Sequence, residues 1–207
     1  MNLSALPELP NRSSEGLTCQ EWNYTLAEVK ANVNSCGKCT VGATYTTTDG
    51  KTHLFITIRD KAYRTVYLYF NQDSAQAIEV DWGDGSATSS STYIGNTYVS
   101  HNYPDGPYPM TYEIKMENVG SAVFRLGPGN IFTGNNPSDT TNMVAGKCAM
   151  LDKVHIGQKL SYLSSNCFRL CRNLKAITIP YGNNVRAYEY SLAACPDLKC
   201  VIFPRGG

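Results

Sequence analysis

The first strong periodicity along the chain is helical. Between Cys19 and Cys36, apolar side chains recur every three or four positions, which places them on one side of a helix. Thr18 and Glu21 have the spacing of a capping box, so the helix is expected to begin there. The resulting apolar seam consists of Cys19, Trp22, Leu26, Val29, Val33 and Cys36. It must be covered either by the protein's own β-structure or by a second copy of the helix in a short coiled coil.

Residues 1–16 lack this periodicity. Pro7, Pro10 and Gly16 interrupt the segment, and its polar remainder favours an extended arm that becomes ordered on a partner. Residues 1–40 are therefore predicted to be an arm followed by a helix, serving in anchoring and oligomerisation.

From residue 41 the pattern changes to short runs in which apolar and polar positions alternate, separated by turn signals. Asp49 and Gly50 suit a type I′ turn between two such runs. Further strands are expected at TVYLYF, AIEVDW, TYVSHNY, MTYEIKM and AVFRLG. The pattern predicts an antiparallel β-sandwich over 41–127, followed by a polar linker over 128–142.

The stretch from Val80 to Ser86, with His101-Asn102-Tyr103 and Tyr112-Glu113-Ile114 downstream, resembles the polycystic kidney disease (PKD) domain. The resemblance implies an immunoglobulin-like sandwich that separates domains or mediates adhesion. Asp81 and Asp84 could form a calcium site or an acid–base pair. Turn formation explains them more simply, because Asp84 can accept backbone amides while Gly85 takes a positive φ.

A repeat follows in residues 143–207. Cys148, Cys171 and Cys195 lie 23 and then 24 residues apart. Aligning them places other apolar residues in columns, namely Leu151, Leu174 and Leu198, then Val154, Ile177 and Val201, then Ile156, Ile179 and Phe203. Units of this length bury their apolar faces only by stacking on one another, so a short solenoid is expected.

The repeat unit closely resembles the BspA-type leucine-rich repeats of bacterial surface proteins. In such a stack Cys148, Cys171 and Cys195 would be buried thiols that act as small apolar groups. Cys167 and Cys200 lie outside that column, and a disulfide involving them stays open. The pair Cys36 and Cys39 could be half of a zinc site or a redox pair, but a loop that ends the helix fits its surroundings better.

Composition narrows the choice of partners. The net charge of +1 provides no field for nucleic acid or an anionic membrane surface. No segment approaches the roughly 18 apolar residues of a membrane span, and residues 1–16 do not resemble a signal peptide.

No motif for catalysis or cofactor binding occurs, and neither a metal nor a cofactor is expected. His53, His101 and His155 fall in separate expected strands and are interpreted as structural. An enzyme with an active site assembled from distant loops is the least favoured alternative.

The 14 tyrosines are the positive signal for function. Tyrosine presents a ring and a hydroxyl to sugars or proteins, although it also favours strands. Tyr181, Tyr188 and Tyr190 are the preferred ligand face, because they lie in the variable part of a repeat. The expected function is attachment or display, with a host surface protein or a glycan as ligand.

Two settings compete for this function. In the first, the protein belongs to a bacteriophage virion, in a fibre or decoration role, and residues 1–16 bind a capsid or tail protein. In the second, it is part of a bacterial cell-surface adhesin. The absent signal peptide and the possible self-association through Trp22, Leu26, Val29 and Val33 favour the virion.

Overall fold

The computed structural model describes residues 4–9, 11, 17–22, 24–33, 41, 43–134, 142–180 and 185–202. The alternating runs of the middle segment form strands, and β4 (Thr65–Gln72) shows the alternation most regularly. In this strand, Val66, Leu68 and Phe70 are fully buried and the residues between them are not. The other strands of this segment are β2 (Ala43–Thr47), β3 (Thr52–Ile58), β5 (Ile78–Asp81), β6 (Ser89–Ser91), β7 (Gly95–Asn102), β8 (Met110–Asn118) and β9 (Phe124–Leu126).

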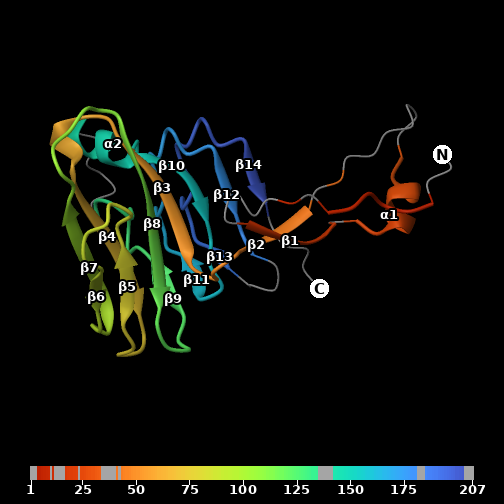
Figure 1. The fold of residues 1–207 in the computed structure, drawn as a ribbon, viewed down its shortest axis with the longest axis horizontal. Helices are drawn as coiled ribbons and strands as arrows, with labels where there is room; N and C mark the ends of the chain where they lie inside the picture. Colours follow the sequence, from red (N-terminus) through yellow and green to blue (C-terminus); the bar gives the residue numbers. More distant parts are fainter. Residues whose placement is uncertain are drawn as a thin grey trace.

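The repeat segment adds a helix and five short strands. These are α2 (Asn142–Cys148), β10 (Leu151–His155), β11 (Leu160–Leu163), β12 (Ala176–Thr178), β13 (Arg186–Ala187) and β14 (Cys200–Ile202). Successive strands alternate between two sheets. The seven-stranded sheet has the order β14-β12-β10-β3-β8-β5-β6, and the five-stranded sheet has the order β13-β11-β9-β4-β7. The protein is mainly β, as expected from the sequence (Figure 1).

Strand pairing confirms the central column of the repeat alignment. In the parallel ladder β10-β12-β14, Val154 lies beside Ile177, and Ile177 lies beside Val201. A second parallel ladder, β9-β11-β13, runs in the five-stranded sheet. The chain therefore crosses between the sheets within each repeat.

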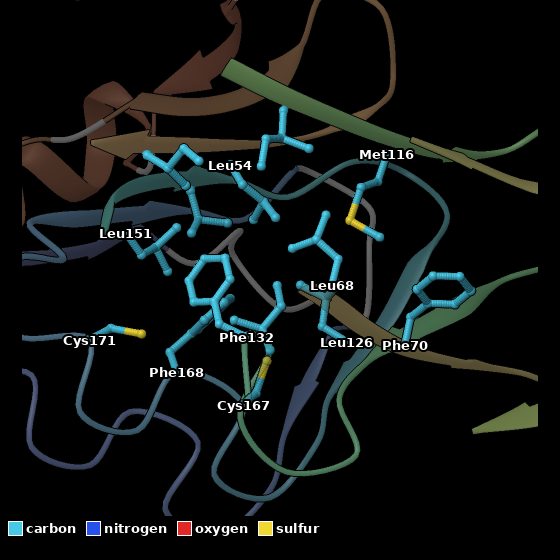
Figure 2. Close-up of a cluster of buried hydrophobic side chains, with 14 of the residues drawn as sticks. Leu54, Leu68, Phe70, Met116, Leu126, Phe132, Leu151, Cys167, Phe168 and Cys171 are labelled. Atoms are coloured by element: carbon cyan, nitrogen blue, oxygen red, sulfur yellow. The ribbon is translucent and has the colours of Figure 1, made fainter. Parts of the chain in front are cut away.

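The boundary predicted at residues 128–142 does not separate two cores. β10 pairs antiparallel with β3, and β11 pairs parallel with β9, so both sheets run through both segments. Within the expected linker, Ile131 and Phe132 are fully buried. Figure 2 shows side chains from both segments in one cluster, including Leu54, Leu68, Met116, Leu151, Phe168 and Cys171. Neither segment covers its apolar face alone, which is why they share one core.

The expected helix over 18–36 is wrong in its first part. Residues Leu17–Trp22 form strand β1, which pairs antiparallel with β2. Helix α1 is short, Leu26–Ala31, and its capping box is Thr25 with Glu28, not Thr18 with Glu21. Pairing with β2 supplies β1 with backbone hydrogen bonds that override the helical spacing.

The predicted seam is consequently divided. Trp22 lies in β1, where its indole nitrogen donates to the Pro7 carbonyl at 2.9 Å. Leu26 and Val29 lie in α1, and Val33 follows the helix. Of these residues only Val29 is buried. Figure 1 shows α1 well away from the two large sheets, with β1 and β2 between α1 and those sheets.

Candidate functional site

The outer face of the five-stranded sheet carries an unusual concentration of tyrosines and amides. On β4, Tyr67, Tyr69 and Asn71 alternate with the buried residues and therefore face away from the core. Asn96 and Tyr98 on β7 are their cross-strand partners. Arg125 on β9 and Tyr162 on β11 continue the same face.

Strand register aligns these side chains in a row that crosses all five strands. The row of Cα partners runs Asn96, Asn71, Arg125, Tyr162 and Arg186. Tyr98 and Tyr69 form the neighbouring pair at one end. At the other end Tyr188 follows β13, and its amide donates to the Leu163 carbonyl at 3.0 Å. We call this surface the tyrosine face, made of Tyr67, Tyr69, Asn71, Asn96, Tyr98, Arg125, Tyr162 and Tyr188.

At the β4–β7 end, three rings form a cluster. The ring centroid of Tyr98 lies 5.6 Å from that of Tyr67 and 5.2 Å from that of Tyr69. Lys147 places its ammonium 4.9 Å from the centre of the Tyr67 ring. Burial raises the pKa of Tyr69, and Tyr98 and Tyr67 raise it further. The Tyr69 hydroxyl therefore stays protonated at neutral pH.

At the opposite end, Tyr162 and Tyr188 have ring centroids 5.6 Å apart, with their planes tilted by 35°. The guanidinium carbon of Arg125 lies 5.2 Å from the centre of the Tyr162 ring. Arg125 also donates through Nη1 to the Asn71 Oδ1 at 3.2 Å and forms an ion pair with Asp73. These contacts fix the position of the guanidinium beside the Tyr162 ring.

Two open hollows lie on this face. One, of about 370 Å³, is lined by Arg125, Tyr162, Ser164, Ser165 and Tyr188. The other, of about 240 Å³, is lined by Tyr69, Asn96, Thr97, Tyr98 and Pro128. Each combines aromatic rings with hydroxyl or amide groups, as specific small-molecule sites do.

The sequence-predicted ligand face is only partly placed here. Tyr188 belongs to the tyrosine face and is 52% exposed, whereas Tyr181 lies outside the described residues. Tyr190 is 69% exposed in the following turn, and it lines neither hollow. The sequence did not predict that the other residues of the tyrosine face lie together. The alternation of Tyr67 and Tyr69 signalled an outward face, but only strand pairing brings β4, β9 and β11 together.

Asp81 and Asp84, the carboxylates that could have formed a calcium site or an acid–base pair, stabilise the turn after β5. Asp81 accepts the Gly83 amide at 2.9 Å, and Asp84 accepts the Ser86 amide at 3.0 Å. Asp84 also contacts His101 Nε2 at 2.7 Å. Burial raises the pKa of Asp84, but its hydrogen bonds to Ser86 and His101 outweigh that effect and hold the pKa below its ordinary value.

A second histidine is held between carboxylates on the opposite sheet. His53 contacts Asp49 through Nε2 at 2.8 Å and Glu113 through Nδ1 at 2.7 Å. Across the described ranges, no three histidine, cysteine or acidic side chains converge as metal ligands would.

Four cysteines of the repeat segment are free thiols inside or near the core. Cys148, Cys167 and Cys171 are buried and Cys195 is partly buried. Burial raises the pKa of Cys148 to about 12 and also raises the pKa of Cys167, Cys171 and Cys195. Such thiols are poor nucleophiles. Cys36 and Cys39 lie outside the described residues, as does the side chain of Cys200.

The tyrosine face is thus the surface of the described chain at which rings, amides and hydroxyls converge over two hollows. Among the described helices, none combines the length and apolarity of a membrane span. No family model, curated protein or solved structure matches the chain, so this surface is interpreted from its own geometry.

Proposed function

We propose that the protein is a non-enzymatic attachment and display protein that recognises a host surface through the tyrosine face. The observation that carries the proposal is the registered row from Asn96 to Arg186, flanked by Tyr98, Tyr69 and Tyr188. Tyrosine, serine and asparagine are enriched in antibody paratopes, and tyrosine and arginine are enriched among the residues that contribute most binding energy.

The chemistry of the face favours binding over catalysis. The Tyr69 hydroxyl has a raised pKa and is a poor proton acceptor in its protonated form. The Arg125 guanidinium is held by Asp73 and Asn71. Rigid rings and oriented polar groups bind a ligand at low entropic cost.

The setting we favour is a bacteriophage virion, in a fibre or decoration role. The small unit of β1, β2 and α1 extends to one side of the two large sheets, with α1 farthest from them, as an anchoring segment would (Figure 1). Its core is small, with Leu17 and Ala43 buried and Trp22 packed against them. Two-stranded sheets are marginal alone, so a capsid or tail protein bound through residues 1–16, or a second copy, would stabilise it.

The alternative setting is a bacterial cell-surface adhesin. The parallel ladder in 23- and 24-residue steps supports it, since it fits a short leucine-rich repeat solenoid of the BspA type. The two-sheet body likewise fits an immunoglobulin-like, PKD-like sandwich. Light scattering on the whole chain and on a chain lacking residues 1–40 separates the settings. An oligomer that becomes monomeric on truncation supports the virion, and two monomers support the adhesin.

Attachment itself is tested by binding of the fluorescently labelled chain to intact cells of a panel of bacterial species, read by flow cytometry. The double variant Tyr98→Ala, Tyr188→Ala should lose binding, because it removes one ring from each hollow. Tyr93→Ala is the matched control, since Tyr93 is 61% exposed but lines neither hollow. Equal binding by the double variant and the wild type would rule out the tyrosine face.

A further inference from the structure

The two hollows differ in lining but offer the same kind of chemistry. Each has tyrosine rings beside groups that donate and accept hydrogen bonds, with Ser164 and Ser165 in the larger and Asn96 and Thr97 in the smaller. A pyranose ring has an apolar face of C–H groups and a rim of hydroxyls. Amphipathic rings beside amides and hydroxyls match both features at once.

The charge at the centre of this face is compensated. Arg125, at the centre of the row, is paired with the Asp73 carboxylate and bonded to Asn71. The other two cations lie toward the ends of the face, Lys147 with its ammonium over the Tyr67 ring and Arg186 beside Tyr162. A ligand that lies over this row therefore meets no strong field of either sign at its centre, which favours an uncharged ligand.

The two hollows lie close together, and a chain of hydrogen-bonded side chains runs between them. The smaller lies over β7 and β4, and the larger over β9 and β11. In the sheet order, β7 and β11 are separated by three strand spacings, or about 14 Å. Between them, Asn71 Nδ2 donates to Asn96 Oδ1 at 2.6 Å while Asn71 Oδ1 accepts from Arg125 at 3.2 Å. This chain of bonds fixes the polar groups before a ligand arrives.

We infer that the tyrosine face binds a neutral, linear oligosaccharide, two units of which occupy the two hollows. The inference rests on the proposed function and specifies its ligand. One sugar unit lies against Tyr98 and Tyr69, another against Tyr162 and Tyr188, and the intervening units lie across Asn71 and Arg125.

The test is calorimetric titration of the full chain with neutral oligosaccharides of defined length. The probes are cellohexaose, maltohexaose, xylohexaose and mannohexaose, each with its disaccharide. At least one hexasaccharide should bind about tenfold or more tightly than its disaccharide, because only the longer chain reaches both hollows. Raising the salt concentration should change the affinity less than about twofold, because no ion pair forms.

Single substitutions then test the two-hollow geometry. Tyr98→Ala and Tyr188→Ala should each remove the advantage of the hexasaccharide, since each leaves one functional hollow. Tyr98→Phe should retain most of the affinity, because the ring remains. Tyr93→Ala should bind as the wild type does. All three positions tested are exposed tyrosines, and near-ultraviolet circular dichroism verifies that each variant keeps its fold.

Three results would overturn the inference. The first is that no hexasaccharide binds, and the second is that hexasaccharide and disaccharide bind equally. The third combines two observations: Tyr98→Ala abolishes attachment to cells, but excess oligosaccharide does not inhibit the attachment of the wild type. The ligand would then be a surface protein. In that case the attachment function stands and only the ligand class fails. Absence of attachment to any cell, with sugar binding intact, would instead reject the attachment function.

Discussion

The turn after β5 depends on a few residues with distinct tasks. Trp82 is fully buried, and the Tyr103 hydroxyl donates to its carbonyl at 2.8 Å. The His101 ring stacks on the indole with centroids 5.2 Å apart. Gly83 and Gly85 both have positive φ, of 74° and 80°, which lets the chain reverse direction after β5.

The two glycines should respond differently to the same substitution. A Cβ at Gly83 would lie 2.3 Å from the Glu113 carbonyl oxygen, whereas a Cβ at Gly85 meets nothing within 4 Å. Gly85→Ala should cost about 1 kcal/mol of the free energy of unfolding through backbone strain alone. Gly83→Ala should cost more than about 3 kcal/mol, because the β8 backbone would have to move. Urea denaturation measures both, and equal costs would contradict the close approach.

Asp84 makes the free energy of unfolding depend on pH. Its pKa is lowered in the folded protein, so its charged form adds stability that is present above the unfolded pKa near 3.8 and lost as pH falls through the folded pKa. Asp84→Asn should reduce the free energy of unfolding by about 1–2 kcal/mol at pH 7. The difference from the wild type should shrink below about pH 4.

Urea denaturation at pH 7 and pH 3 provides the comparison for Asp84→Asn. The control is Asp197→Asn, at an exposed carboxylate in the repeat segment, which should change little at either pH. A difference for Asp84→Asn that stays constant down to pH 3 would show that charge is not its origin.

At the scale of elements, the parallel ladder β10-β12-β14 becomes less covered along its length. Val154 is fully buried, Ile177 is 1% exposed and Val201 is only partly buried. β10 has β3 on one side and β12 on the other, while β14 is the edge strand. Equivalent positions of the repeat are therefore buried to different extents.

The same deletion at two positions of the column should therefore have unequal effects. Val154→Ala should lower the free energy of unfolding by about 2 kcal/mol, because it removes two methyl groups from a filled core. Val201→Ala should cost less than about 1 kcal/mol, since its side chain is partly in water already. Chemical denaturation of the two variants decides, and similar costs would place β14 inside the core.

At the scale of the whole molecule, the central fact is a single core filled by two dissimilar segments. Leu54 and Leu68 come from the middle segment, and Leu151 and Phe168 from the repeats (Figure 2). β3 lies between β8 and β10, so its edge is covered only when the repeats are present. Unfolding should accordingly be cooperative across both segments.

A fragment of residues 41–127 should not fold cooperatively by itself. It would expose the β3 edge and lose the core contacts of Leu151 and Phe168. The matched chain of residues 41–207 should give one thermal transition whose calorimetric and van't Hoff enthalpies agree. Differential scanning calorimetry tests both, and a cooperative transition in the fragment would restore the two-domain description.

Local chemistry was enough to predict several features. Alternation of apolar positions identified β4 and the mainly β class, because side chains of a strand point to opposite faces whatever the partner strand is. The 23- and 24-residue steps identified which residues lie side by side in β10, β12 and β14. Aspartate and glycine after β5 identified a turn, because both the carboxylate bonds and positive φ are local.

Features that depend on distant partners were decided only by tertiary structure. The spacing from Thr18 to Val33 suits a helix, yet pairing with β2 makes Leu17–Trp22 a strand. The polar sequence over 128–142 predicts a linker, yet Phe132 within it is buried in the shared core. The tyrosine face joins residues from β4, β7, β9 and β11, which adjoin only after both sheets form. Sequence periodicity determines which side of an element is apolar, but the free energy of covering that side determines which elements meet.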